Sequence, residues 1–312
     1  MTKAQGALVY RGAVYASLTY FQAIVMGVIQ GVTELFPVSS LGHGVLVPAL
    51  LGWHNLVGTQ SVKQSFFLVF LVGLHVGTAL GLLFFYRRTW FALFRGLFNQ
   101  LGRVRDEGAA SLWRLNDASI NESYRLLVIL AIGSVPVGIV GVVLESKLRE
   151  LFAKPLAAAI FLMVNGLILL LGERLRRTRG RHARFQDVNT LAPSSALGVG
   201  SAQILALLAG ISRSGVTMVA GLLSGLDHEG AANFSFLLAT PVILLAGLYK
   251  LPELFGALGS GVRTQTLVGA LFAMVTAYVA VRFLTKWFKT KTLTPFAIYC
   301  LIAGALCAVR FA

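Results

Sequence analysis

Six segments of this sequence are apolar over about twenty residues each, the length that an α-helix needs to cross a bilayer. They lie at 66–86, 125–144, 154–173, 233–250, 264–284 and 292–311. The chain of 312 residues is 56% hydrophobic and 12% charged, whereas a soluble domain carries about a quarter charged residues. The sequence therefore predicts an all-α polytopic membrane protein with six spanning helices.

The basic residues cluster between the apolar segments and give the chain a formal net charge of +15. Three clusters lie at 87–114, 174–184 and 282–291. Because cytoplasmic loops carry an excess of Lys and Arg, we assign these loops to the cytoplasm and the loops 145–154 and 250–263 to the opposite side. This placement fits contact with anionic membrane lipids and argues against nucleic-acid binding.

Two further regions, 20–53 and 193–226, are apolar but are interrupted by Gly, Pro, Ser and charged residues. Such interruptions argue against one continuous helix. The charge pattern of the neighbouring spans predicts that each region is a re-entrant helical hairpin, with 20–53 entering from outside and 193–226 from inside. We expect the two hairpins to meet near the membrane midplane.

A weak internal repeat supports this arrangement. At an offset of 173 positions, the identical pairs that align include Gln30 with Gln203, Ser39 with Ser212, Gly42 with Gly215, Leu50 with Leu223 and Gly52 with Gly225. Similar sequence in opposite orientation is typical of an inverted-topology repeat, in which the working site lies at the repeat interface. We therefore predict one membrane domain over 1–312, with repeat 1 at about 20–173 and repeat 2 at about 193–312.

The first broken region holds five polar residues within fourteen positions: Gln30, Glu34, Ser39, Ser40 and His43. Ionisable groups at hydrocarbon depth are functional candidates by default. His43 is a candidate for proton transfer near neutral pH, and Glu34 is a candidate to orient it, activate water or hold a divalent cation. Ser39 and Ser40 are candidate phosphate ligands, and one is a candidate nucleophile if His43 removes its proton. Alternatively, Glu34 and His43 only satisfy buried backbone at the helix break.

The second broken region contains Arg213, the only charge between Asp187 and Asp227. The planar guanidinium suits bidentate binding of phosphate. Three neighbouring hydroxyl groups and the backbone N–H groups of a broken helix end would complete an anion site; the hydroxyl residues are Ser212, Ser214 and Thr217. The structural alternative is an ion pair between Arg213 and Glu34.

The remaining polar residues are expected to be structural. His75 lies within a span and is expected to pack, Asn165 is expected to form an interhelical hydrogen bond, and 96–122 is expected to be a loop with room for a surface helix. Three histidines at loop edges are expected to be solvated: His54, His182 and His228. Cys300 and Cys307 lie about 10 Å apart along one helix, which is too far for a disulfide.

The two motifs together resemble those of the BacA-type undecaprenyl-diphosphate phosphatases. The first motif reads Gln30-x-x-x-Glu34 and then Pro37-Val-Ser39-Ser40-x-Gly42-His43, and the second reads Gly210-x-Ser212-Arg213-Ser214-Gly215-x-Thr217. The resemblance extends over most of the chain, including the stretch 234–241 that follows the second motif. Both motifs together are specific, whereas either alone would be much less so.

The resemblance implies an integral enzyme of the bacterial inner membrane that hydrolyses undecaprenyl diphosphate to the monophosphate and inorganic phosphate. This reaction recycles the lipid carrier for cell-wall synthesis and bears on bacitracin resistance. The family also implies a site open to the outer face and support by a divalent cation, magnesium or calcium. The implied site residues are Glu34, His43, Arg213, Ser39, Ser40, Ser212, Ser214 and Thr217.

Two positions depart from the family pattern. Gln30 stands where many members have Glu, so that Glu34 is the only carboxylate of its motif and Gln30 contributes weakly to any metal site. Ala209 stands where the family usually has Pro, which removes a rigid turn but no chemical group.

Our hypothesis is therefore phosphoanhydride hydrolysis of a polyprenyl diphosphate at a midplane pocket among membrane lipids. The sequence leaves open whether water, a serine or a histidine attacks, and whether the protein forms a homodimer. The alternative from another class is a polyprenyl-phosphate transporter or flippase, because inverted repeats with midplane sites are also the architecture of alternating-access carriers.

Overall fold

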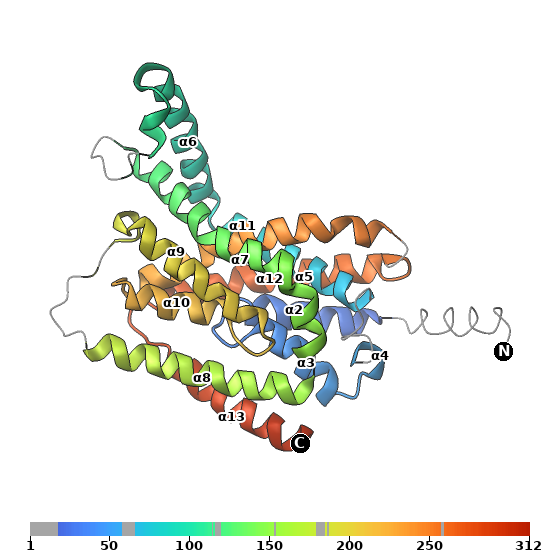
Figure 1. The fold of residues 1–312 in the computed structure, drawn as a ribbon. Helices are drawn as coiled ribbons and strands as arrows, with labels where there is room; N and C mark the ends of the chain where they lie inside the picture. The colour runs from blue at the N-terminus through green and yellow to red at the C-terminus, as the bar shows by residue number, and fades with distance from the viewer. Residues whose placement is uncertain are drawn as a thin grey trace.

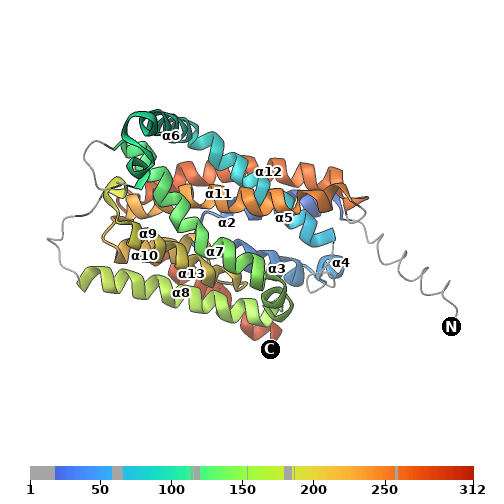
Figure 2. The ribbon, with the colours of Figure 1, turned by 45° about the horizontal axis from the view of Figure 1, so that its top comes forward.

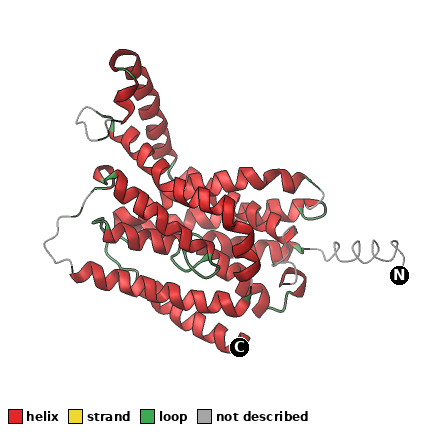
Figure 3. Ribbon diagram, in the orientation of Figure 1, coloured by secondary structure: helices red, strands yellow, loops and turns green. Residues whose placement is uncertain are grey.

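The computed structural model describes residues 18–57, 66–113, 115, 120–152, 154–178, 185, 187–256 and 259–312, which form helices and contain no β-strand. Six of these helices are long and apolar enough to span a membrane, as predicted. They are α5 (Phe66–Phe85), α7 (Glu122–Phe152), α8 (Pro155–Thr178), α11 (His228–Phe255), α12 (Arg263–Trp287) and α13 (Thr294–Phe311). Figures 1 and 3 show these helices gathered in one bundle.

Several spanning helices extend beyond their predicted bounds because their terminal turns are polar. α11 begins at His228, ahead of its predicted start at 233, since Asp227 caps it by accepting a hydrogen bond from the backbone N–H of Gly230 at 2.6 Å. α8 continues past 173 into a basic last turn that contains Arg176 and Arg177, where cations complement the helix dipole. Hydropathy alone does not detect such turns.

Both interrupted regions are pairs of short helices. In the first, α2 (Tyr20–Thr33) is followed by a break and then α3 (Ser40–Leu50), with α4 (His54–Val57) after it. In the second, α9 (Pro193–Ala202) leads through η3 (Gln203–Leu207) and a break to α10 (Arg213–Leu223). The predicted interruption of both regions is confirmed. That the two pairs are re-entrant, and that they belong to an inverted repeat, stays a prediction.

Equivalent residues cap the second helix of each pair. Ser39 caps α3 by accepting a hydrogen bond from the Gly42 N–H at 3.1 Å, and Ser212 caps α10 by accepting one from the Gly215 N–H at 3.1 Å. Ser39 with Ser212 and Gly42 with Gly215 are two of the pairs that the offset of 173 aligns. The shared cap explains why serine and glycine recur at this spacing, and it supports the proposed repeat.

Small residues let α2 pack closely against α12 (Figure 2). A Cβ atom at Gly27 would clash with the carbonyl of Gly269, and one at Gly31 would clash with Thr276 Oγ1 and the carbonyl of Ala273. Close approach of this kind is the usual basis of helix association in membranes. It holds the end of α2, and therefore the first break, against a spanning helix.

The prediction of a loop over 96–122 is wrong in its first part. Helix α6 (Arg87–Glu107) follows α5 directly, and a short η1 (Ala109–Trp113) leads towards α7. Figure 1 shows α6 projecting from the bundle beside the beginning of α7. The surface helix expected in this region is thus present, and it is longer than the loop interpretation allowed.

Candidate active site

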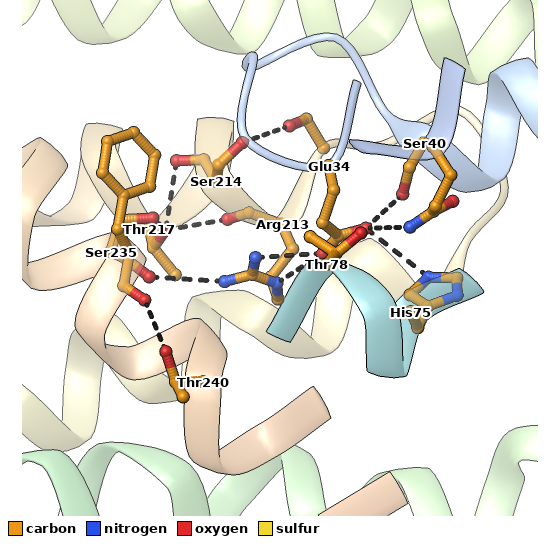
Figure 4. Close-up of polar contacts among 12 residues, drawn as sticks. Glu34, Ser40, His75, Thr78, Arg213, Ser214, Thr217, Ser235 and Thr240 are labelled. Carbon is orange, nitrogen blue, oxygen red and sulfur yellow. Dashed lines mark hydrogen bonds and ion pairs between the residues drawn. The ribbon is translucent and has the colours of Figure 1, made fainter. Parts of the chain in front are cut away.

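The two breaks meet through an ion pair that joins their charged residues. Glu34 is the C-cap of α2, and Arg213 is the first residue of α10. Glu34 Oε1 accepts hydrogen bonds from Arg213 Nη2 at 3.0 Å and from Arg213 Nε at 3.3 Å (Figure 4). Both side chains are largely buried, so the pair is shielded from water. The ion pair foreseen by the structural alternative is therefore present.

The second oxygen of Glu34 gathers three further side chains. Ser40 Oγ donates a hydrogen bond to Glu34 Oε2 at 2.5 Å, and Gln30 Nε2 donates to the same oxygen at 3.1 Å. His75 Nε2 lies 3.5 Å from it. Glu34 thus links a hydroxyl group, an amide, an imidazole and a guanidinium, which makes it the centre of this polar cluster (Figure 4).

His75 is the residue whose position the sequence interpretation missed. It was expected to pack against the repeat interface in a structural role, but it faces the carboxylate of Glu34 from α5 with about a quarter of its side chain exposed. Its Nδ1 lies 2.8 Å from the carbonyl oxygen of Leu71, which leaves Nε2 directed at the carboxylate. The signal was available, because an ionisable residue within a span is a functional candidate by default.

Further residues besides Glu34 position the side chain and backbone of Arg213. Its Nη1 donates to the backbone oxygen of Ser235 on α11 at 3.4 Å. Thr217, one turn along α10, accepts or donates a hydrogen bond with Ser235 Oγ and donates to the backbone oxygen of Arg213 at 2.8 Å. Ser235 lies in the stretch that follows the second motif, and the motif itself did not indicate its contact with Arg213. The guanidinium is therefore fixed at the N-terminus of α10, where the helix dipole favours anions.

The serines of the second motif connect the breaks. Ser214 Oγ donates to the backbone oxygen of Phe36 at 3.2 Å and lies 3.0 Å from Ser212 Oγ. Asn165 of α8 spans the same junction, since its Nδ2 donates to the carbonyl of Pro37 and its Oδ1 accepts from the Ser212 N–H. Asn165 Nδ2 also donates to Cys300 Sγ on α13 at 3.3 Å, so the prediction that Asn165 forms an interhelical hydrogen bond is confirmed.

Ser39 and Gly210 form a further contact between the two breaks. Ser39 Oγ accepts a hydrogen bond from the Gly210 N–H at 3.2 Å, besides the one from Gly42 that caps α3. Gly210 has φ +113°, where a side chain would be strained, and a Cβ there would clash with α8. Ser39 itself has φ +69°, which is uncommon for a residue other than glycine and is typical of functional or tightly constrained sites.

His43 forms its hydrogen bonds with residues other than Glu34. Its Nδ1 lies 2.7 Å from the backbone oxygen of Ser39, and its Nε2 lies 2.7 Å from the hydroxyl group of Tyr299 on α13. The structure therefore shows no contact by which Glu34 would orient His43; the imidazole near Glu34 is that of His75. His43 and Ser40 still share one face of α3, three residues apart.

The other predicted structural residues give mixed results. Cys300 and Cys307 are free and buried, as expected. The prediction that His228 is solvated is wrong, since it is buried and its Nε2 lies 2.6 Å from Glu173 Oε1. His182 and the side chain of His54 lie outside the described part of the structure.

A divalent cation would find one carboxylate at this site. Among the described residues, no group of three His, Cys, Asp or Glu side chains is placed to hold a metal ion. Magnesium is commonly held by one or two carboxylates together with substrate phosphates. Glu34, with the adjoining Gln30 amide, therefore fits a cation only if the substrate supplies most of the other ligands.

Comparison with known proteins gives a consistent assignment. A profile described as "Bacitracin resistance protein BacA" matches residues 23–306. The chain is 48% identical to "Undecaprenyl-diphosphatase 2" of Frankia alni, over 95% of this chain and 98% of that protein. It is 47% identical to "Undecaprenyl-diphosphatase" of Mycolicibacterium paratuberculosis (95% and 99%) and 43% identical to "Undecaprenyl-diphosphatase 2" of Burkholderia orbicola (91% and 94%). The chain with these two facing motifs belongs to the BacA family.

Proposed function

We infer that this protein hydrolyses undecaprenyl diphosphate to undecaprenyl phosphate and inorganic phosphate. The relatives that it matches along nearly their whole length are named for this activity. The observation that carries the assignment to a site is the ion pair of Glu34 with Arg213 across the two breaks, with Ser40 hydrogen-bonded to the same carboxylate. The transporter alternative is not favoured, because the names of these relatives describe a hydrolase.

Arg213 and the N-terminus of α10 would bind the terminal phosphate. A guanidinium binds two phosphate oxygens through parallel N–H groups, and helix N-termini favour anions. Charge that develops on the transferring phosphoryl group would be stabilised by the same groups, which is the main catalytic contribution in such reactions. Ser212, Ser214 and Thr217 surround Arg213 and stay the proposed phosphate-binding hydroxyl groups.

Ser40 is the nucleophile that the geometry favours. Its Oγ–H already points to Glu34 Oε2, so the carboxylate is placed to accept the proton as Oγ attacks the terminal phosphorus. The bond between that phosphorus and the bridging oxygen then breaks, and undecaprenyl phosphate leaves. Water attacks the phosphoserine in the second step and releases inorganic phosphate, while the proton held by Glu34 returns to Ser40. His43 stays a candidate for proton transfer to the leaving oxygen or from the water.

The proposed cation would neutralise charge on the diphosphate. Glu34 would hold it, with Gln30 as a weak additional ligand and phosphate oxygens of the substrate completing its shell. Glu34 has one oxygen on Arg213 and one on Ser40, so in the free protein it is fully engaged by side chains of this chain. The proposed entrance for the lipid lies on the outer face, as the resemblance to the BacA family implies.

Phosphate release by purified protein in detergent tests this function, since detergent removes any contribution from transport. We expect the wild type to release phosphate from undecaprenyl diphosphate, and Glu34→Gln to lower the rate by about 100-fold or more because a general base contributes that much. Ser224→Ala is the control, since Ser224 is the C-cap of α10, its Oγ donates to the carbonyl of Ala220, and it is no part of the proposed site.

Added Mg²⁺ is the second variable of this assay. A response to Mg²⁺ in the wild type that Glu34→Gln abolishes supports the cation at Glu34. No release by the wild type, with or without Mg²⁺, would overturn the enzymatic assignment. A rate for Glu34→Gln equal to that of Ser224→Ala would overturn the assignment of the site.

A further inference from the structure

We propose that α6 lies in the headgroup layer of the membrane and binds anionic phospholipid. The proposed reaction does not use this helix, and the observations that assign it are a stripe of exposed aromatic residues, a set of unpaired arginines and its position at the end of a span. Such a helix is typical of segments that lie along a bilayer surface.

The apolar stripe consists of four residues that recur at helical spacing: Phe91, Phe94, Phe98 and Leu101. Their side chains are 77%, 49%, 70% and 48% exposed, so the protein itself does not cover them. Isolated exposed apolar residues are ordinary, but a contiguous row of three phenylalanines and a leucine marks an interaction surface.

The opposite face of α6 is already occupied. Trp90 and Leu93 are buried, and Gly96 packs so closely that a Cβ would contact the backbone nitrogen of Tyr124 at the start of α7. Gln100 Nε2 donates to the backbone oxygen of Ser111 at 3.2 Å. These contacts fix the rotation of α6, and therefore the apolar stripe points away from the protein.

The charges of α6 match a negatively charged surface. The helix contains five arginines and two acidic residues, and both acidic residues are at its C-terminal end. Within the described part of the chain, Arg88, Arg95 and Arg105 make no ion pair, whereas Arg103 is paired with Glu107 at 2.6 Å. By helical geometry, Arg88 and Arg95 flank the stripe along one side. Unpaired arginines beside an apolar stripe suit lipid phosphates above acyl chains.

The position of α6 brings this face to the membrane. The helix begins immediately after α5. Arg87, its first residue, lies over the ring of Phe84, with Cζ 5.0 Å from the ring centroid, and its Nη1 donates a hydrogen bond to the Phe84 carbonyl. Phe84 is exposed on the spanning helix, where lipid would cover it. The stripe thus continues the lipid-facing surface of α5 outwards, while Figure 1 shows α6 turning away from the bundle. An acidic partner protein would need to displace lipid from this place, which makes lipid the occupant that we propose.

The test places a nitroxide spin label at Phe98→Cys, on the stripe, and at Asn99→Cys, on the polar side, in the full chain with Cys300 and Cys307 replaced by Ala. Each variant is reconstituted into vesicles of phosphatidylcholine alone and of an equal mixture with phosphatidylglycerol. The label at 98 is expected to collide with oxygen and not with a water-soluble nickel chelate, and the label at 99 is expected to show the reverse. Labelling at Phe91→Cys repeats the measurement if Phe98→Cys does not fold.

Equal access of the chelate to 98 and 99 would overturn the proposal, because α6 would then lie in water. Protection of 98 from both probes would overturn it in favour of a protein partner or a second copy of the chain. The arginines are tested by Arg88→Gln with Arg95→Gln, which is expected to abolish the deeper burial of the label at 98 that phosphatidylglycerol produces. If phosphatidylglycerol causes no such shift in the wild type, the anionic part of the proposal fails. Phosphate release in detergent should be unchanged in this variant, so the outcome is independent of the proposed reaction.

Discussion

Ser39 and Ser40 are neighbours in the sequence, but their hydroxyl groups have different surroundings. Ser39 Oγ accepts hydrogen bonds from two backbone N–H groups, of Gly42 and Gly210. Ser40 Oγ instead donates to Glu34. The sequence could not separate their roles, because the distinction depends on the residue at which α3 begins.

Alanine substitution of each serine separates the two roles. Ser39→Ala should lower the free energy of unfolding by about 1 kcal/mol through the lost cap. Ser40→Ala should leave thermal stability close to that of the wild type and lower phosphate release by about 100-fold or more, since it removes the proposed nucleophile. Thermal unfolding in detergent and phosphate release measure the two effects. If instead Ser39→Ala lowers phosphate release and Ser40→Ala lowers stability, Ser39 is the catalytic serine and Ser40 the structural one.

Glu34 and Arg213 show how far residue patterns lead. Their motifs indicated two parts of one site, and the structure brings them within hydrogen-bonding distance. His75 and Tyr299, which contact Glu34 and His43, lie outside both motifs. Contacts between distant segments of this kind depend on how the helices are packed, which local pattern does not specify.

At the scale of elements, apolar length predicts the spans well and the helix ends poorly. All six predicted spans are helices, because twenty apolar residues in a membrane have few other ways to satisfy the backbone. α6 was missed as a continuous helix, since it is amphipathic and charged and has no apolar window of spanning length. The close packing of α2 on α12 was also not predicted, because glycines such as Gly27 and Gly31 can equally well lie on a helix face that contacts lipid.

Gly31→Ala should destabilise the protein by about 1–3 kcal/mol, the usual effect of overpacking. The added Cβ would clash with Thr276 and Ala273 and push α2 away from α12. Gly198→Ala is the matched control, as its Cβ would meet no atom within 4 Å and alanine favours the helix. A lower midpoint of thermal unfolding for Gly31→Ala alone is expected. Equal midpoints for the two variants would show that α2 and α12 are not held in close contact.

The orientation of the whole molecule was predicted from charge, which assigns the three basic loops to the cytoplasm. Glu173 and His228 form a buried pair near the basic last turn of α8, and Glu173 Oε1 also accepts from the Leu293 N–H at 2.7 Å. This group fastens α8, α11 and the start of α13 at one end of the bundle. The end is therefore structurally defined, while the assignment of that end to the cytoplasm rests on the positive-inside rule.

Labelling of single cysteines by a membrane-impermeant maleimide tests this orientation. In intact cells we expect Ser260→Cys, in the loop before α12, to react, and Lys289→Cys, in the basic loop before α13, to react only after the membrane is made permeable. Both positions are exposed, and the native cysteines are buried. If only Lys289→Cys reacts in intact cells, the topology is opposite to the one assigned here.

A double-mutant cycle on phosphate release tests whether the two breaks form one catalytic site. Glu34→Asp, Arg213→Lys and the double variant would be compared with the wild type by kcat/KM in detergent. Because the two side chains are hydrogen-bonded to each other, we predict a coupling energy above about 0.5 kcal/mol between the two substitutions. Additive losses in kcat/KM, or variants that lose stability while keeping wild-type kcat/KM, would show that Glu34 and Arg213 do not act together in one catalytic site.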